Sequence, residues 1–382
     1  MSVYEDDLSR IVHELNHTAP SQQAARQNSL DPLLQSAVKQ SASDVLLVAG
    51  SPVTLRVNGT LLAVASPPLT AQELRHLLLP LLTTEQTAEL ERSRALDLCF
   101  VRGTLGRFRA NLHYQRGTLA ASIRVLPAQI PTIESLHLPP ALAALTDRRQ
   151  GLILLTGPTG SGKTSTLAAL IDRINANRRD HILTIEDPIE YQHANRKSIV
   201  EQIEVGRDTP SFAQAVRAVL RQNPDVILVG EMRDSETIAA ALTAAETGHL
   251  VLSSLHTNDA AQTVSRILDS FPTSNQPQIR QQLSLALVAV VAQQLVPSTG
   301  NAAQPGLYPA VEIMMATLAI RNLIRTGQDH QIRSHISTGR REGMFTMDQS
   351  LSELVRAGRI TRETALAHCY HSDELISNLN IS

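Results

Sequence analysis

The chain has 382 residues, of which 42% are hydrophobic and 18% are charged, so it is long enough for two or three domains and is not disordered in bulk. Aromatic residues make up only 3% and tryptophan is absent, a composition that favours helices packed on a parallel sheet over an all-β sandwich. The formal net charge of −2 lacks the basic excess of proteins that bind through many phosphate contacts, so no direct nucleic-acid partner is expected.

The sequence favours a cytoplasmic location. Cys99 and Cys369 lie too far apart for a C-x-x-C pair, and two thiols cannot form a four-cysteine zinc site. Residues 1–7 are acidic and no apolar segment follows them, so no signal peptide is predicted. The longest apolar run, Leu285–Ala292, is far too short to cross a bilayer. Any link to a membrane is therefore expected through a partner protein.

The first part of the chain predicts a polar extension followed by a small α+β domain. Residues 1–29 are polar and predict a disordered or loosely helical extension, whereas residues 30–126 alternate helical and strand patterns. Asn58-Gly59 stands between two apolar segments and predicts a hairpin turn. The predicted helices lie near residues 33–38, 69–82 and 85–90, and the predicted strands at 45–48, 53–57, 61–64, 97–101, 106–114 and 119–126.

The second part of the chain predicts an α/β domain with further helices after it. Residues 127–141 are punctuated by prolines, which predicts an inter-domain linker with a short helix near 133–136. From residue 142 to 275, apolar runs alternate with amphipathic helices, the pattern of a doubly wound α/β domain. Residues 276–382 are predicted to be mostly helical, with a capping box at Thr346 and Gln349.

A complete P-loop sequence runs from Gly157 to Thr164. An apolar run precedes it and residues with helical spacing follow it, so the strand, loop and helix that a phosphate site needs are all predicted. Lys163 is expected at the β- and γ-phosphates of ATP, and the hydroxyl of Thr164 is expected to ligate Mg²⁺. The predicted nucleotide-binding residues are Gly157, Pro158, Thr159, Gly160, Ser161, Gly162, Lys163, Thr164 and Ser165.

Three further apolar runs end in polar clusters that contain Glu186, Glu231 and His256. In an open α/β sheet, ligands bind at the carboxyl ends of the strands, so these clusters are expected to converge on the nucleotide. Phosphoryl transfer to water requires an oriented water molecule, a role that we assign to Glu231. Glu186 either holds Mg²⁺ through a water or shares the base role. Gly230 stands where many P-loop enzymes carry a metal-binding Asp, so the predicted metal ligands are Thr164 and Glu186.

Two histidines and two arginines are candidates for contact with the γ-phosphate. His249 and His256 flank the third of these runs, and either could donate a hydrogen bond to phosphate. Because a strand separates them, joint chelation of a metal is not expected. Arg109 and Arg124 lie on predicted strands of the first domain and could neutralise charge in the transition state if that domain closes over the nucleotide. Periodicity alone favours a solvated face for these arginines.

Four segments together resemble the motifs of the secretion ATPase superfamily of P-loop NTPases. They look like its Walker A motif, Asp box, atypical Walker B motif and His box, and they span residues 157–164, 184–191, 227–234 and 247–257. The Gly230-Glu231 pair is normal in that superfamily. Within it, over about residues 30–370, the chain resembles the PilT/PilU-like retraction ATPases of type IV pili.

The resemblance implies a PAS-like N-terminal domain, a RecA-like ATPase domain with a helical C-terminal region, and a homohexameric ring. ATP and Mg²⁺ would bind between the two domains, and Arg109 and Arg124 would complete the site. Domain motion would then drive pilus retraction and twitching motility. The implied partners are the inner-membrane pilus platform protein and a paralogous retraction ATPase, which places the protein at the cytoplasmic side of the inner membrane.

The match to the retraction group has two departures. Residues 319–325 match most of the segment that the group links to retraction, but Thr326 stands where that segment has Glu. Leu46 stands where the group has His in an early strand.

Other functions remain open at this point. The same motifs occur in type IV secretion, conjugation and pilus-assembly ATPases, although the assembly enzymes usually carry a larger N-terminal region and a four-cysteine zinc module. A nucleotide-binding regulator of a partner motor is a third hypothesis. The complete set Lys163, Thr164, Glu186 and Glu231 argues against it, because a degenerate regulator is expected to lack at least one of them.

Overall fold

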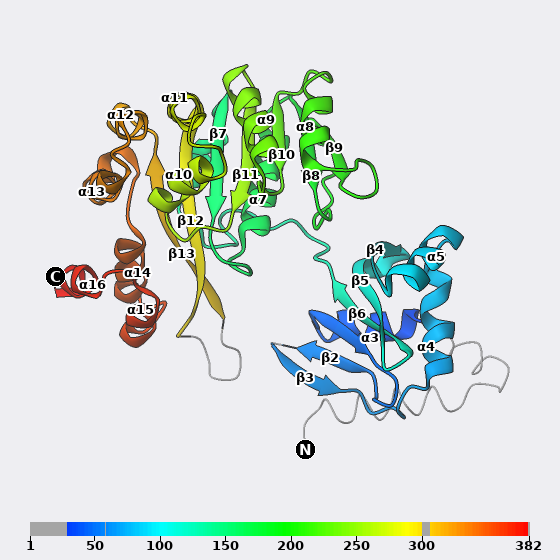
Figure 1. Cartoon of the computed structure of the whole chain (residues 1–382). Coiled ribbons are helices and arrows are strands. Elements are labelled where there is room, and N and C mark those ends of the chain that lie inside the picture. The colour runs from blue at the N-terminus through cyan, green and yellow to red at the C-terminus, as the bar shows by residue number, and fades with distance from the viewer. Residues whose placement is uncertain (1–28, 58, 300–305, 381–382) are drawn as a thin grey trace. The chain divides into compact units, whose positions relative to one another are not determined.

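The computed structural model describes residues 29–57, 59–299 and 306–380, and these form two compact units that divide between Ala128 and Gln129. The predicted extension, residues 1–29, falls almost entirely outside the described residues, as does Asn58 of the predicted hairpin turn. Figure 1 draws both units, each of which is described by itself below.

The first unit is an antiparallel sheet of six strands with helices packed on it. Its strands follow the order β3-β2-β1-β6-β5-β4, and all neighbours are antiparallel. The core contains Leu34 of one helix, Leu74 of another and Phe108 of a strand, all fully buried. The elements are α3 (Asp31–Lys39), β1 (Asp44–Leu47), β2 (Thr54–Val57), β3 (Thr60–Ala63), α4 (Ala71–Leu78), α5 (Thr84–Ser93), β4 (Ala95–Arg102), β5 (Gly106–Gln115) and β6 (Thr118–Val125). The predicted small α+β fold is therefore present.

The second unit contains a sheet of seven strands in the order β13-β12-β7-β11-β10-β8-β9. All neighbouring pairs are parallel except β12 with β13, which places the carboxyl ends of six strands at one edge of the sheet. The strands are β7 (Gly151–Thr156), β8 (His181–Glu186), β9 (Ile199–Glu204), β10 (Val226–Val229), β11 (Leu250–Leu255), β12 (Leu287–Pro297) and β13 (Leu307–Met315).

Helices cover both faces of this sheet. Because side chains alternate along each strand, every strand contributes apolar residues to the core on each face. On β7, Leu152 and Leu154 join one core cluster, whereas Ile153 and Leu155 join the other. The first cluster also contains residues of α8 (Phe212–Val219), α9 (Ser235–Glu246), α10 (Ala260–Asp269), α11 (Gln276–Ala286), α12 (Leu318–Thr326) and α13 (Ile332–Thr338). The second cluster contains residues of α6 (Ala141–Leu145) and α7 (Lys163–Asn177). This is the predicted doubly wound arrangement.

The C-terminal helices pack beside the long strands β12 and β13 (Figure 1). These helices are α14 (Met347–Arg356), α15 (Arg362–His368) and α16 (Ser372–Asn380). Thr346 forms the predicted capping box with Gln349 at the start of α14. The stretch after α14 turns at Gly358, whose φ of 67° is left-handed.

One buried carboxylate joins α14 to α10. Glu312 on β13 is only 3% exposed, and its side chain accepts hydrogen bonds from the N–H of Ala260 (2.9 Å) and the N–H of Met347 (3.4 Å). Ala260 and Met347 are the first residues of α10 and α14, where backbone N–H groups lack partners within the helix. Burial raises the pKa of Glu312 to about 7, against hydrogen bonds that lower it.

The structure corrects two local predictions in this unit. Residues 276–382 hold the predicted helices but also β12 and β13, which extend the sheet beyond the P-loop strand. The apolar run in β12 has no polar residue to set a period, so a buried strand and a buried helix look alike in sequence. Residues 133–136, predicted as a short helix, form turns instead, and Ile133 and Leu138 of the predicted linker are buried in the core.

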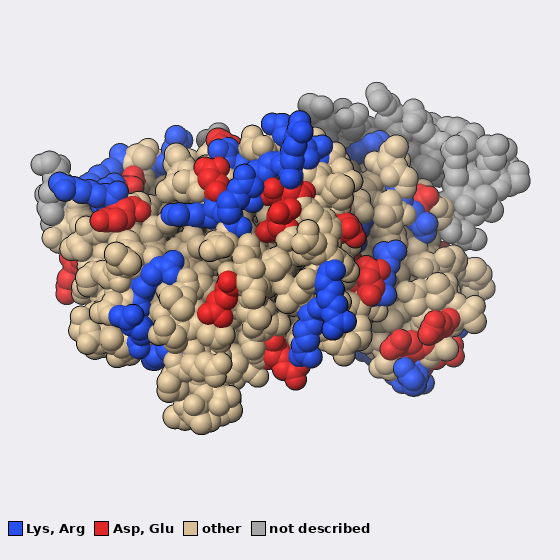
Figure 2. All heavy atoms as spheres, turned by 90° about the horizontal axis from the view of Figure 1, so that it is seen from above, with Lys and Arg blue, Asp and Glu red and all other residues tan. Residues whose placement is uncertain are grey.

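Among the described residues, no helix is both long enough and apolar enough to cross a membrane. On the face drawn in Figure 2, Lys and Arg side chains are interspersed with Asp and Glu among many neutral residues.

Candidate nucleotide site

The P-loop connects the end of β7 to the start of α7, as predicted. Two of its glycines are required by the close approach of β12. A Cβ on Gly157 would lie 2.1 Å from the backbone oxygen of Gln293, and a Cβ on Gly162 would lie 2.8 Å from the side-chain nitrogen of the same residue. Both glycines also have left-handed φ values, 143° and 86°, which other residues rarely adopt.

The side chains of the P-loop fit a phosphate group. Lys163 folds over the loop, where its Nζ donates to the carbonyl oxygens of Gly157 (2.7 Å) and Pro158 (2.9 Å). Burial lowers the pKa of Lys163, and the nearby carboxylate of Glu231 opposes that change. The buried hydroxyl of Ser161 has no hydrogen-bond partner among the described residues, so it is available to donate to a phosphate oxygen. Thr164, in the first turn of α7, is exposed and free to ligate a metal.

The structure brings Glu231 and His256 together at the carboxyl edge of the sheet. Glu231 follows β10 and His256 follows β11, which are parallel neighbours. His256 Nε2 lies 3.4 Å from Glu231 Oε2, and Arg233 Nε lies 2.8 Å from Glu231 Oε1. The carboxylate is thus held between two cationic or polar groups, with a side chain that is 16% exposed. Glu231 can therefore reach solvent water while its orientation is fixed.

Glu186 ends β8 at the same edge but is almost completely buried. Its Oε1 accepts hydrogen bonds from Thr184 Oγ1 (2.7 Å) and Gln202 Nε2 (3.1 Å). Burial raises the pKa of Glu186 above its ordinary value, and these hydrogen bonds act against that increase. The environment suits a group that binds a cation or a proton better than one that faces bulk water.

The Asp box loop is attached to the P-loop helix. The hydroxyl of Tyr191 and the hydroxyl of Ser165 lie 2.8 Å apart, and either can donate. Gln202 Nε2 also donates to the carbonyl oxygen of Tyr191 at 2.9 Å. Glu186 and the first turn of α7 are therefore held in one fixed arrangement.

His249 does not lie with these residues, which corrects its predicted role at the γ-phosphate. It precedes β11, and its backbone oxygen accepts from the N–H of Gly151 at the start of β7. The length of β11 separates it from His256 by about 20 Å, at ~3.3 Å per residue. Its Nδ1 lies 2.9 Å from the carbonyl oxygen of Ala244, a contact that fixes the end of α9. The sequence placed both histidines beside one strand, and that strand points them to opposite edges of the sheet.

The two predicted arginines lie next to each other in the first unit. Arg109 on β5 is directly opposite Arg124 on β6, and Arg124 is opposite Asp44 on β1. Arg124 Nε lies 3.1 Å from Asp44 Oδ1, and Arg56 on β2 lies 3.6 Å from the other oxygen of the same carboxylate. Asp44 thus offsets the repulsion between neighbouring cations on this face of the sheet.

Sequence reasoning missed two residues that support the P-loop. Thr257 contacts the end of β7, since its hydroxyl lies 2.6 Å from that of Thr156. Gln293 contacts the loop itself, through a hydrogen bond of 2.7 Å to the carbonyl oxygen of Ser161. A signal for Gln293 was available, because it is the first polar residue after the apolar run of β12. The same rule located the ends of the other three strands.

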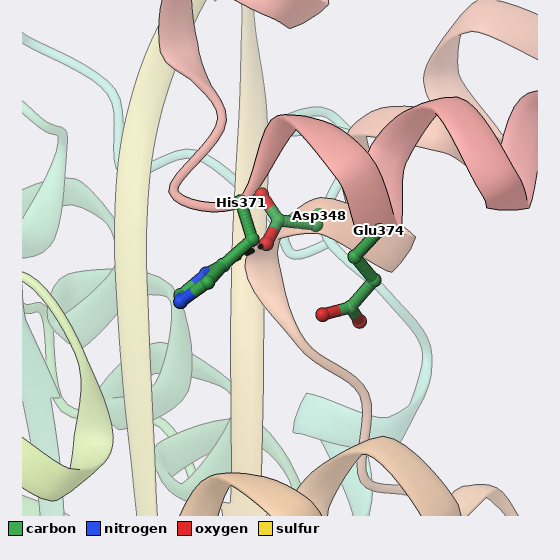
Figure 3. Close-up of side chains that lie close together, drawn as sticks. All are labelled: Asp348, His371 and Glu374. Carbon is green, nitrogen blue, oxygen red and sulfur yellow. Dashed lines mark ion pairs between the residues drawn. The ribbon is translucent and has the colours of Figure 1, made fainter.

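A separate cluster of potential metal ligands lies near the C-terminus. Asp348, His371 and Glu374 bring their ligand atoms within 4.8 Å of one another (Figure 3). Arg333 Nη2 lies 3.0 Å from Asp348 and also pairs with Glu374. The guanidinium already supplies the positive charge between the two carboxylates, so the cluster is an ion-pair network that holds α16 against α14.

A comparison with known protein families decides the family. The model of the type II/IV secretion system protein family matches residues 20–374. The chain belongs to this family. The family prediction made from the four motifs is confirmed, and so is the α/β fold class.

Several members of this family are similar to the chain over nearly their whole length. The chain is 44% identical to a Pseudomonas aeruginosa protein named type IV pilus retractation ATPase PilT, over 87% of this chain and 96% of that protein. It is also similar to a crystal structure of the pilus retraction motor PilT with bound ADP, with a TM-score of 0.85, 44% identity, and coverage of 91% and 99%. The ATPase DotB of Legionella pneumophila matches with a TM-score of 0.76 and 28% identity, over 88% of this chain and 94% of that one.

Proposed function

We propose that this chain is an ATPase that drives the retraction of a type IV pilus. The observation that carries the proposal is the complete P-loop with Glu231 and His256 at the same sheet edge, in a chain that is 44% identical to a retraction ATPase over 87% of its length. A regulator without catalysis has no need of a carboxylate held beside the P-loop lysine.

The residues of the second unit divide the work of ATP hydrolysis. The N–H groups of the P-loop and Lys163 bind the phosphates, and the free hydroxyl of Ser161 donates a further hydrogen bond. Thr164 and Glu186 are the residues that would hold Mg²⁺. When bound, Mg²⁺ neutralises charge on the phosphate oxygens. Glu231 accepts a hydrogen bond from the attacking water and orients it toward the γ-phosphorus.

The partially exposed His256 has two roles in the proposal. Its contact with Glu231 orients the carboxylate, and its exposed ring donates a hydrogen bond to the released phosphate. Arg109 and Arg124 of the first unit supply positive charge to the transition state. Support for the arginine roles comes from the family resemblance.

The motor acts as a homohexamer that works on the inner-membrane platform protein of the pilus, alone or together with a paralogous ATPase. It is cytoplasmic and peripheral to the inner membrane. A type IV secretion ATPase is the second candidate, because the family whose model matches is that of type II/IV secretion system proteins. The chain is also 28% identical to the ATPase DotB, whose structure covers 88% of it. The higher identity to PilT, 44%, favours retraction.

The first experiment measures ATPase activity across a size-exclusion run for the wild type, Glu231→Gln and Glu236→Gln. Glu236 is an exposed carboxylate on α9 that pairs with Arg217, so it controls for the loss of one charge. Activity confined to a hexamer-sized peak, kept in Glu236→Gln and lost in Glu231→Gln, supports the proposal. An inactive wild type, or activity in a monomer peak, contradicts it.

A second experiment separates retraction from secretion. The wild type and Glu231→Gln are expressed in a bacterium whose own retraction ATPase has been deleted, and twitching motility is scored. Restoration by the wild type alone is expected. Failure of an active enzyme to restore twitching, together with rescue of a strain that lacks its secretion ATPase, would favour the second candidate.

A further inference from the structure

Strand β12 passes unusually close to the P-loop. Its register places Ala292 opposite Thr156, the last residue of β7, so the next residue, Gln293, stands beside the loop. The side chain of Gln293 is only 3% exposed. The approach is close enough that Gly157 and Gly162 cannot carry a Cβ without a clash against this one residue.

The amide of Gln293 makes two hydrogen bonds, one to the P-loop and one to the first turn of the helix that follows it. Its Nε2 donates to the carbonyl oxygen of Ser161 at 2.7 Å, and its Oε1 accepts from the hydroxyl of Thr166 at 2.9 Å. Thr166 is fully buried in the first turn of α7. An amide offers one donor side and one acceptor side, and both are used here.

The bond to Ser161 fixes the direction of a phosphate-binding group. In a planar trans peptide the carbonyl and the following N–H point in opposite directions. Because the carbonyl of Ser161 points at Gln293, the N–H of Gly162 points away from it, toward the concave side of the loop. That N–H belongs to the set which a P-loop directs at phosphate oxygens.

We propose that Gln293 is a positioning residue of the nucleotide site, whose amide holds the P-loop in its phosphate-binding shape. The inference deepens the proposed function, since it rests on nucleotide binding at this loop. Gln293 does not touch the reacting atoms. It acts through Ser161 and Thr166, and it makes the conformation of the loop depend on the position of β12.

Gln293→Glu gives a test with a reversible readout. An ionised carboxylate would face the carbonyl oxygen of Ser161, so two acceptors would meet and the hydrogen bond would be lost. A protonated carboxyl would restore both bonds, because its O–H can donate to Ser161 and its C=O can accept from Thr166. Burial raises the pKa of a carboxyl, so the change falls in an accessible range.

The dissociation constant of ADP is measured by calorimetry at about pH 8 and about pH 6 for the full-length wild type, Gln293→Glu and Gln293→Leu. At each pH, the dissociation constant of a variant is divided by that of the wild type. We expect Gln293→Glu to weaken ADP binding about 10- to 100-fold at the higher pH and to recover at least about fivefold at the lower pH. Gln293→Leu is expected to bind ADP more weakly than the wild type at both pH values. Gln294→Glu is the matched control, because Gln294 lies on the opposite face of β12 and donates to the carbonyl of His368.

Two outcomes would overturn the inference. One is a Gln293→Leu variant that binds ADP as tightly as the wild type. The other is a Gln293→Glu variant whose dissociation constant, relative to the wild type, changes with pH no more than that of Gln294→Glu. A role in folding alone would lower the unfolding temperature but leave the affinity per folded molecule unchanged at either pH. If Gln293→Leu does not fold, Thr166→Val decides, since it removes one partner of the amide and is expected to weaken ADP binding about 2- to 10-fold. A wild type that binds no ADP would instead refute the proposed function.

Discussion

The buried carboxyl of Glu312 should make the second unit less stable as the pH rises. Its pKa is raised from 4.5 to about 7 by burial, with the charge of Asp259 adding to the increase and that of Arg333 opposing it. Between these two values the folded state binds more protons than the unfolded state. The contribution to stability is therefore complete below about pH 4.5 and is lost as the pH rises through about 7.

The size of the effect follows from the two pKa values. The full shift from 4.5 to about 7 corresponds to about 3–4 kcal/mol, at ~1.4 kcal/mol per unit of pKa. Between about pH 5.5 and pH 8, the part of this that is lost amounts to about 2 kcal/mol. A glutamine side chain at position 312 does not titrate, so it contributes no such change of stability with pH. We therefore expect the free energy of unfolding of Glu312→Gln, relative to the wild type, to increase by about 2 kcal/mol over this range.

The first assay is urea unfolding of the full chain at both pH values. The second is hydrogen exchange of peptides from α10 and α14, because Glu312 accepts hydrogen bonds from the first N–H group of each helix. Any constant cost of the new amide cancels in the comparison between pH values. Glu353→Gln, on the exposed side of α14, is the control for removing one carboxylate. A difference between Glu312→Gln and the wild type that does not change with pH would refute the reasoning.

Three further predictions concern the nucleotide site and its support. Ser161→Ala should leave the stability of the nucleotide-free protein unchanged or raised, because the hydroxyl has no partner, while the ATP dissociation constant increases about 2- to 10-fold; calorimetry and thermal unfolding test both parts. Lys163→Ala should abolish ATP binding in the same calorimetric assay, and retained binding would remove Lys163 from its role. Glu231→Gln should bind ATP normally but hydrolyse it about 10²–10⁴-fold more slowly, and a wild-type rate would transfer the role to Glu186.

The sequence predicted best those parts of the site that follow from local pattern. The P-loop, the capping box of α14 and the strand ends at Glu186 and Glu231 each depend on residues close together in the chain. Such patterns specify geometry because a strand, a loop and a helix in succession have few ways to connect. The order of the strands in the sheet had to come from the structure.

Contacts between segments that are distant in the chain could not be predicted from the sequence. Gln293 lies more than a hundred residues after Ser161, and only the pairing of β12 with β7 brings them together. His249 was misplaced for the opposite reason, since its nearness to His256 in sequence spans the full length of a strand. The position of Gln293 follows from the pairing of β12 with β7, and the position of His249 follows from the direction of β11.

The position of Arg321 has a consequence for genetic studies of residues 319–325, which resemble most of the segment that the retraction group links to retraction. Arg321 on α12 donates to the carbonyl oxygens of Ser284 (2.7 Å), Leu287 (2.7 Å) and Ala316 (2.9 Å), at the junction where α11 becomes β12. A non-motile phenotype of an Arg321 variant would therefore report a damaged fold as readily as a lost partner. Leu318, which is 87% exposed on the same helix, is the position where a substitution probes a binding surface without disturbing that junction.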